Sequence, residues 1–282
     1  DSITSAGNGP PGYHAFLLED LGFGHTGVLA ARIGDTIVVA NSRSSLLTAI
    51  YGATHSSNTV VCMLGANDLN SSGSDVDTIL SDFKAYAQAR QTEGWNVVWM
   101  TPSTSDRDGN TNVGGFEVQR ADMITKIKRD PSWYDGLVNI GDTAELGDFA
   151  QVGGVYIPGG THWSTAGHKA AATYITPVVQ GVLAGHTKPG APTGLSATAG
   201  TGEVTLSWTA PASDGGSAIT DYYVWYSDDG GVSWSRFDDA VSATTGATVT
   251  GLTGGTEYTL EVQAVNAVSP GDLSGQDTTT PS

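Results

Sequence analysis

The sequence predicts two domains of different class: an α/β domain with a mainly parallel sheet, followed by an all-β sandwich. In the first part of the 282 residues, short apolar runs alternate with helical patterns. The last part has short strands and turn signals but no helical pattern. Between the two, residues 185–192 are rich in proline and glycine, which resist helix and central strand. We therefore expect domains at residues 1–187 and 188–282.

Four apolar runs of the first part have the character of buried strands. Each is short, rich in β-branched residues and nearly continuous in hydrophobicity, as expected for strands covered on both faces. In chain order they are Thr36–Ala40, Thr59–Leu64, Asn96–Thr101 and Leu137–Ile140.

Helical patterns lie between and beyond these runs. They span Tyr13–Leu21, Val76–Thr92, Phe116–Arg129 and Ser164–Leu183. Strands that alternate with helices imply right-handed crossovers and a mainly parallel sheet with helices on both faces, which is a three-layer sandwich. Active sites in such folds gather beyond the carboxyl ends of the strands.

The second part has the pattern of an antiparallel β-sandwich. The sequence Asp-Gly-Gly recurs at residues 214–216 and 229–231, and it supplies turn chemistry between strands. The strand candidates are Val204–Trp208, Tyr222–Ser227, Thr248–Thr250 and Tyr258–Asn266.

Composition limits the classes of partner. Twelve Lys and Arg face 29 Asp and Glu, a formal charge of −17, which argues against nucleic acid. Residues 189–282 hold 11 acidic and one basic residue, a net of −10, and residues 1–188 hold 18 acidic and 11 basic residues, a net of −7. No apolar stretch approaches the roughly 18 residues of a membrane span. A single cysteine, Cys62, excludes a Cys-based zinc site, and Asp106–Asn112 fails the spacing of a calcium loop, so we expect no metal.

Several runs of the second part together resemble a fibronectin type III domain. The resemblance implies that Trp208 is the core aromatic of the second strand. It also implies that Tyr258 forms a tyrosine corner, with its hydroxyl tied to the backbone near Leu252. The runs that carry it are Pro192–Leu195, Val204–Trp208, Tyr222 with Tyr223, and Leu252 followed by Tyr258–Asn266.

Three motifs of the first part resemble the SGNH/GDSL hydrolase family over almost all of residues 1–187. They match its nucleophile block, its Gly-x-Asn-Asp block and its C-terminal histidine block, in that order. In this sequence the blocks are Asp1–Gly7 (DSITSAG), Gly65–Asp68 (GAND) and His162–His168 (HWSTAGH). The resemblance implies a flavodoxin-like SGNH hydrolase fold and a serine ester hydrolase that uses no cofactor.

The resemblance also implies which residues act. Ser2 is the implied nucleophile, and His162 is the base that takes its proton. The oxyanion formed in ester hydrolysis needs fixed donors. In the family these are the nucleophile's backbone N–H, a glycine N–H and an Asn side chain, so Ser2 and Asn67 correspond directly. No glycine exists where the second donor falls, and the backbone of Ser44 or Ser45 takes its place.

The sequence departs from the family at two further points. Gly159 stands where the family has an Asp three residues before the histidine, so Asp142 or a main-chain carbonyl would have to orient His162. The strand that delivers the nucleophile would lie upstream of Asp1, so we expect an upstream fragment or a partner chain to supply it. Asp1 and Trp163 are candidates to line the substrate pocket, although Trp163 fits burial at a helix start equally well.

Two functions of different class follow. The first is a serine esterase for carboxylic esters of small molecules or glycans, for example a glycan deacetylase, with the β-sandwich as a spacer or adhesion module. The alternative is a non-catalytic structural or receptor-binding protein of a virion, such as a phage tail, or of a cell surface. It would retain the SGNH hydrolase fold, and Gly159 favours it. Both hypotheses predict a secreted, extracellular or virion-associated protein.

Overall fold

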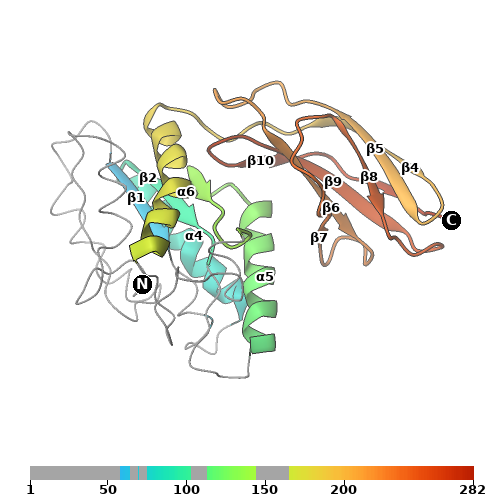
Figure 1. Ribbon diagram of the computed structural model, residues 1–282, viewed down its shortest axis with the longest axis horizontal. Coiled ribbons are helices and arrows are strands. Elements are labelled where there is room, and N and C mark those ends of the chain that lie inside the picture. The colour runs from blue at the N-terminus through green and yellow to red at the C-terminus, as the bar shows by residue number, and fades with distance from the viewer. Residues whose placement is uncertain (1–57, 64–68, 70–74, 103–112, 144–164) are drawn as a thin grey trace. The chain divides into compact units, whose positions relative to one another are not determined.

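The computed structural model describes residues 58–63, 69, 75–102, 113–143 and 165–282 (Figure 1). The chain divides into two compact units, the first ending at Ala184 and the second covering Gly185–Ser282 together with Lys128–Pro131. The strand predicted at Thr36–Ala40 and the helix predicted at Tyr13–Leu21 lie outside the described residues.

The first unit contains a parallel sheet of three described strands. Their order is β1 (Asn58–Met63), β2 (Trp95–Met100) and β3 (Gly136–Val138), and both pairings are parallel. Each strand begins one residue before the apolar run that predicts it. The prediction of parallel strands is therefore confirmed for these three runs.

Three helices accompany the sheet, namely α4 (Val76–Thr92), α5 (Val113–Arg129) and α6 (Thr165–Leu183). α4 has the predicted bounds. It begins where the Asp75 carboxylate accepts a hydrogen bond from the Thr78 backbone N–H at 2.8 Å, which satisfies one of the free N–H groups of the first turn. It ends before Gly94, whose φ of 83° suits a helix stop. None of the described helices is both long and apolar enough to span a bilayer.

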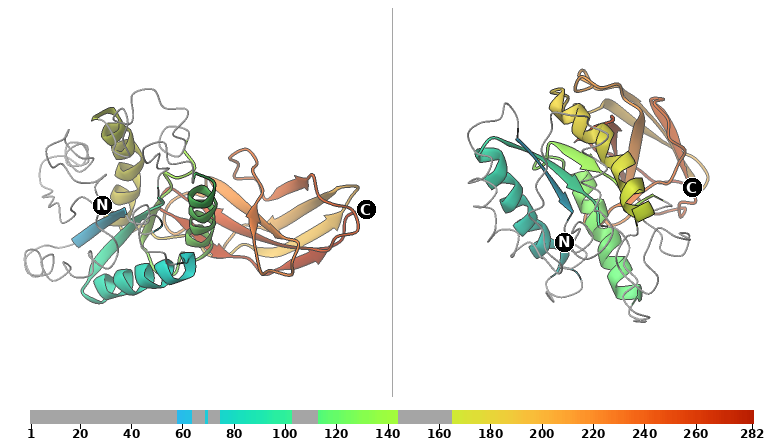
Figure 2. Two further views of the ribbon diagram at one scale, coloured as in Figure 1. Left: turned by 90° about the horizontal axis from the view of Figure 1, so that it is seen from below. Right: turned by 60° about the vertical axis from the view of Figure 1, so that its left-hand side comes forward.

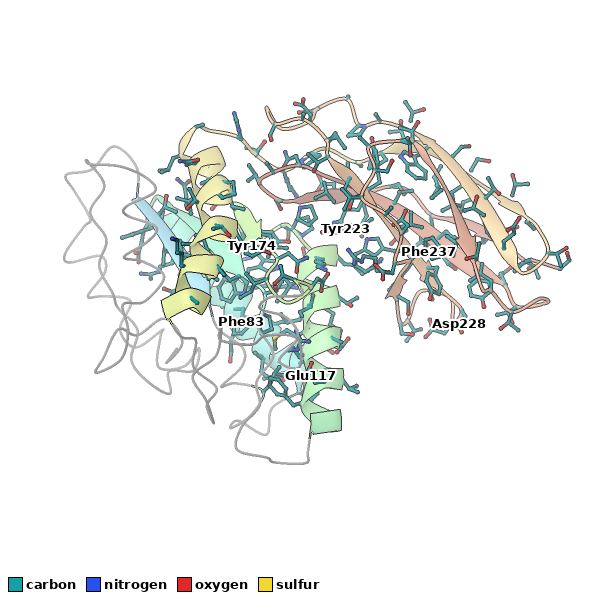
Figure 3. All side chains as sticks on the ribbon, viewed as in Figure 1. Phe83, Glu117, Tyr174, Tyr223, Asp228 and Phe237 are labelled. Atoms are coloured by element: carbon teal, nitrogen blue, oxygen red, sulfur yellow. The ribbon has the colours of Figure 1, made fainter. Side chains whose placement is uncertain are left out.

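One face of the sheet packs against α4 and α5. Alternate side chains of the strands, such as Cys62, Val97 and Trp99, form one core with Phe83 of α4 and Ile127 of α5 (Figure 3). The ring centroids of Phe83 and Trp99 lie 4.7 Å apart. The odd-numbered residues of β2 therefore face these two helices.

α6 covers the opposite face. A Cβ atom added to Gly136, the first residue of β3, would lie 2.8 Å from Val178 Cγ1 and 3.0 Å from Val182 Cγ2, both on α6. It would also lie 3.4 Å from Cγ2 of Val98, an even-numbered residue of β2. Helices thus cover both faces, and the three-layer prediction is confirmed for the described part of this unit (Figure 2).

The second unit is an antiparallel β-sandwich, as predicted. One sheet has the order β4 (Thr193–Ala199), β5 (Glu203–Thr209) and β8 (Gly246–Thr250). The other has the order β10 (Pro270–Leu273), β9 (Tyr258–Val265), β6 (Asp221–Ser227) and β7 (Ser235–Arg236), and β11 (Asp277–Thr279) also pairs with β9. The sequence predicts β5, β6, β8 and β9 but not the other four strands.

Both aromatic roles implied for this sandwich are confirmed. Trp208 on β5 is 6% exposed and packs edge to face on Tyr222, with ring centroids 5.2 Å apart. The hydroxyl oxygen of Tyr258 accepts a hydrogen bond from the Thr253 backbone N–H at 3.1 Å. This bond is the tyrosine corner, one residue after the expected Leu252.

Replacing Gly136 should loosen the contact between α6 and the sheet. Gly136→Ala is expected to destabilise the first unit by about 1–3 kcal/mol, because its Cβ meets two valines whose χ1 angles are stiff. Scanning calorimetry measures the effect as a lowered transition temperature. Gly275→Ala is the matched control, because no atom lies within 4 Å of its added Cβ. Equal transitions for both variants would contradict the close packing.

Removing the Tyr258 hydroxyl should weaken the sandwich. Tyr258→Phe leaves the Thr253 N–H without its acceptor and is expected to cost about 1–2 kcal/mol, measured by urea unfolding. Tyr226→Phe is the control, because the Tyr226 hydroxyl bonds to no described residue. If both variants unfold at the same urea concentration, the corner bond contributes nothing.

Candidate functional site

The segments that follow β2 and β3 are joined by the buried hydroxyl of Thr101. Thr101 is fully buried, and its Oγ1 accepts a hydrogen bond from the Gly141 backbone N–H at 2.8 Å. The same hydroxyl donates to Asn139 Oδ1 at 3.3 Å. Its backbone N–H donates to the Val138 carbonyl at 3.0 Å. Thr101 therefore fixes the carboxyl ends of both strands in one register.

This network ends in an exposed carboxylate. Asn139 Nδ2 donates to Asp142 Oδ2 at 3.2 Å, and Asp142 is exposed. Because the Asn139 oxygen already accepts from Thr101, its amide nitrogen is the end that faces Asp142. The chain from Thr101 through Asn139 thus holds the Asp142 carboxylate at the carboxyl edge of the sheet.

α5 fastens the same two segments from one side. Arg120 Nη1 donates to the Pro102 carbonyl at 3.3 Å and to the Gly141 carbonyl at 3.1 Å. Its Nε donates to Glu117 Oε2 at 2.7 Å (Figure 3). A Cβ atom on Gly141 would lie 2.9 Å from the Pro102 carbonyl oxygen, a backbone atom that cannot move aside easily, so this position favours glycine. The edge is therefore rigidly built, as a site that has to hold a carboxylate in place requires.

α6 packs against β3 through its C-terminal part. Val178 and Val182, near the end of the helix, pack against Gly136 at the amino end of β3. Thr165 precedes Val178 by about 20 Å along the helix axis, which is about the length of β2. The C-terminal part of α6 is therefore fixed at the amino end of β3, and the helix is long enough for its first turn to reach the carboxyl ends of the strands.

The residues that the SGNH/GDSL resemblance assigns to the site lie outside the described residues. Two of them are close in sequence to described elements. Asn67 follows the last residue of β1 by four positions, and His162 precedes the first residue of α6 by three. The full set is Asp1, Ser2, Ser44, Ser45, Asn67, His162 and Trp163, and Gly159 lies outside as well.

The sequence names Asp142 but not the two residues that position it. Thr101 directly follows β2, and Asn139 directly follows β3. A polar residue at the carboxyl end of an apolar run is the signal that could have identified both. Their pairing depends on the register between β2 and β3, which the sequence does not state.

Two further observations concern metals and thiols. Within the described ranges, no group of three or more His, Cys, Asp or Glu side chains is arranged to hold a metal ion. Burial raises the pKa of the Cys62 thiol to about 12, so this cysteine stays protonated and unreactive at neutral pH.

Comparison with known proteins identifies the second unit. Residues 190–280 match the fibronectin type III domain family, so this part of the chain is such a domain. Protein turtle of Drosophila melanogaster is 32% identical over 97 residues. These residues cover 34% of this chain and 6% of that protein, so the chain spans only a small part of the curated relative.

Solved structures match over the same third of the chain. Domains A168–A170 of titin are 33% identical, and the match covers 34% of each chain with a TM-score of 0.32. A fibronectin type III-like protein from Clostridium thermocellum is 26% identical, with 34% of this chain and 96% of that chain covered and a TM-score of 0.28.

The Thr101 hydroxyl should contribute to the stability of the first unit. Thr101→Val keeps the shape but leaves the Gly141 N–H without an acceptor in a buried place, at an expected cost of about 1–3 kcal/mol. Thr101→Ser keeps the hydroxyl and should cost about 1 kcal/mol for the lost methyl. Urea unfolding measures both, and a larger loss in the Ser variant would contradict the role of the hydroxyl.

Proposed function

We propose that this chain, whose residues 190–280 form a fibronectin type III domain, is an extracellular or virion-associated serine esterase. Residues 1–187 would form a flavodoxin-like SGNH hydrolase domain that cleaves carboxylic esters of small molecules or glycans. The β-sandwich would serve as a spacer or adhesion module.

The observation that supports this proposal is the convergence of four chain segments on one edge of the sheet. Thr101 follows β2, and the Asn139–Asp142 pair follows β3. In sequence, Asn67 comes four residues after β1 and His162 comes three residues before α6. Active sites of open α/β sheets lie beyond the carboxyl ends of the strands. The described edge thus offers the kind of place that the esterase residues require.

In the proposed mechanism, His162 takes the proton of the Ser2 hydroxyl as its oxygen attacks the ester carbonyl. The negative charge on the carbonyl oxygen is met by the Asn67 side chain and by the backbone N–H groups of Ser2 and of Ser44 or Ser45. His162 then gives its proton to the leaving alcohol, and water releases the acyl group by the same steps.

Asp142 is proposed to do the work of the acid that Gly159 replaces. A histidine base needs a partner that fixes its tautomer and holds the imidazolium that forms. Asp142 is an exposed carboxylate that is held by Asn139, so its direction is set before any substrate binds. Among the described residues, Asp142 is the acidic side chain that comes after β3 at the proposed edge.

The second candidate function is a structural or receptor-binding protein of a virion or cell surface that has kept the fold without the chemistry. The fibronectin type III domain supports it, because such domains commonly act as spacers or interaction modules. Gly159 supports it too, since a hydrolase normally carries an acid there. The two functions differ in whether Ser2 reacts.

Labelling of Ser2 separates the two functions. The full-length protein is expected to hydrolyse p-nitrophenyl acetate and to be labelled by a fluorophosphonate at Ser2, as mass spectrometry of the labelled peptide would show. Ser2→Ala should abolish both, because the attacking oxygen is gone. If the fluorophosphonate does not label the wild-type protein, the esterase proposal is wrong and the structural role is favoured.

Asp142→Asn should lower kcat by about 10²–10⁴-fold with little change in KM, because His162 loses the partner that orients it. Asp82→Asn on α4 is the matched control, since it removes the same charge without touching the Thr101 network. An Asp142→Asn enzyme as fast as the control would exclude Asp142 as the third residue.

A further inference from the structure

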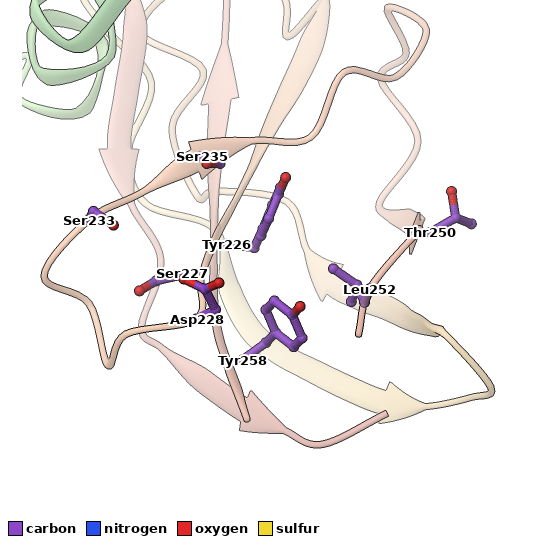
Figure 4. A pocket seen from close by; sticks show the side chains of 9 residues that line it. Tyr226, Ser227, Asp228, Ser233, Ser235, Thr250, Leu252 and Tyr258 are labelled. Carbon is purple, nitrogen blue, oxygen red and sulfur yellow. The ribbon is translucent and has the colours of Figure 1, made fainter. Parts of the chain in front are cut away.

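An open pocket lies within the fibronectin type III domain. Its volume is about 280 Å³. Tyr226, Ser235 and Asp228 line it from the β6–β7 hairpin, and Thr250 lines it from the end of β8 (Figure 4). The pocket lies entirely within the second unit, so its shape is independent of the first.

Four polar side chains that line this pocket make no hydrogen bond to the described part of the chain. The Asp228 carboxylate and the hydroxyls of Tyr226, Ser235 and Thr250 have no hydrogen-bond partner among the described residues. Three of them can both donate and accept, and the carboxylate accepts strongly. Together they offer a ligand several hydrogen bonds without breaking any that hold the domain together.

Two aromatic rings line the same pocket. The ring centroids of Tyr226 and Tyr258 lie 6.2 Å apart, and their planes are tilted by 60°. Tyr258 is buried and its hydroxyl is engaged with Thr253, whereas Tyr226 is only half-buried. Because the Tyr226 ring also packs against the core of the domain, only a small part of it is open to the pocket beside the unused hydroxyls.

The turn that carries Asp228 is held rigidly by its neighbour. The Asp229 carboxylate accepts hydrogen bonds from Ser233 Oγ at 2.6 Å, from Ser227 Oγ at 2.7 Å and from the Val232 N–H at 3.0 Å. These bonds hold the pKa of Asp229 far below its usual range, the bond from the Ser233 side chain contributing most. Because the turn is already ordered, a ligand would lose little free energy in ordering it.

The charge around the pocket narrows the class of ligand. Residues 189–282 carry a net charge of −10, and neither Lys nor Arg lines the pocket. A phosphate, a sulfate or an acidic sugar would be repelled. A cationic group would use the carboxylate and the Tyr226 ring but leave the donors of three hydroxyls without acceptors.

We propose that this pocket binds a neutral saccharide. The hydroxyls of a sugar both donate and accept hydrogen bonds, as do those of Tyr226, Ser235 and Thr250, so the mainly polar lining of the pocket matches such a ligand. Asp228 would accept from one or two sugar hydroxyls. The proposal concerns the second unit alone and holds whether or not Ser2 is catalytic.

Affinity electrophoresis of the full chain tests the proposal. Native gels would contain hydroxyethyl cellulose, arabinoxylan, galactomannan or soluble starch, and a gel without polysaccharide gives the reference mobility. We expect at least one of these neutral polymers to retard the protein. Asp228→Asn and Tyr226→Phe should each weaken the affinity measured from the retardation about tenfold, because the first replaces a charged acceptor with a neutral amide and the second removes a hydroxyl.

Asp238→Asn is the matched control for Asp228→Asn. Both remove one negative charge from an exposed position in the same domain, so their reference mobilities change alike, but Asp238 does not line the pocket. Its retardation should equal that of the wild type. Both pocket variants leave the core unchanged, so loss of retardation would not reflect unfolding.

Three results would overturn the proposal. The first is no retardation by any of the four polymers. The second is retardation that Asp228→Asn, Tyr226→Phe and Asp238→Asn leave equally intact, which would place sugar binding elsewhere. The third is binding of an arginine-rich peptide, measured by titration calorimetry, that Asp228→Asn abolishes while no polymer retards the protein. That result would reassign the pocket to a cationic partner.

Discussion

The central strand β2 has to be covered on both faces, and this requirement organises the first unit. Val97, Val98, Trp99 and Met100 are all fully buried, so neither face of the strand meets water. α4 and α5 bury one face and α6 buries the other. A strand enclosed in this way favours apolar side chains along its length, because a buried polar group without a partner is costly. The indole Nε1 of Trp99 is an exception, buried without a hydrogen-bond partner among the described residues. The polar side chains that do find partners, Asn96 and Thr101, lie near or just beyond the ends of the strand.

The polar side chain of Thr101, just beyond the end of β2, helps to form a potential site. It is the first polar side chain after the apolar run of β2, and it is still fully buried. Its hydroxyl has to be satisfied, and the nearest groups are those that follow the neighbouring strand, Asn139 and Gly141. The same bonds that stabilise the end of the sheet thus orient Asn139 toward Asp142. Stability and the placement of a carboxylate follow from one buried hydroxyl.

The sequence predicts those elements whose signals are local. α4 has the bounds that its helical pattern predicts, and the structure shows that both ends are set locally, since Asp75 caps its start and Gly94 follows its stop. The apolar runs predict β1, β2 and β3 for the same reason. The run at Leu137–Ile140 extends beyond β3 because Ile140 is apolar and fully buried, although it packs after the strand has ended. A hydrophobic run predicts burial, and Ile140 is buried although it no longer belongs to the strand.

Elements and contacts that depend on distant partners are not predicted. β7 has two residues, Ser235 and Arg236, and exists only because it pairs with Trp225 and Tyr226 of β6. β11 likewise exists through its pairing with β9. In the candidate site, the acid Asp142 can be weighed from its place after an apolar run, but the bond from Thr101 to Asn139 requires the register of two strands. The sequence therefore offers Asp142 as a candidate acid, whereas the hydrogen bonds that hold it become visible only in the folded structure.

The two proposed sites make different demands on the chain, and this difference bears on how they would act together. The described part of the edge of the parallel sheet holds the exposed Asp142 carboxylate, which a buried network fixes, and this suits a reaction in which a proton has to be directed. The pocket of the β-sandwich has unused hydroxyls beside a ring on an already ordered turn, which suits weak, reversible contact with a polymer. A linker that joins the two units keeps any polymer held by the second at a raised concentration near the first. An esterase whose esters lie along a neutral glycan would gain from such a module even if each sugar contact were weak, because many equivalent sites lie within reach of one tether.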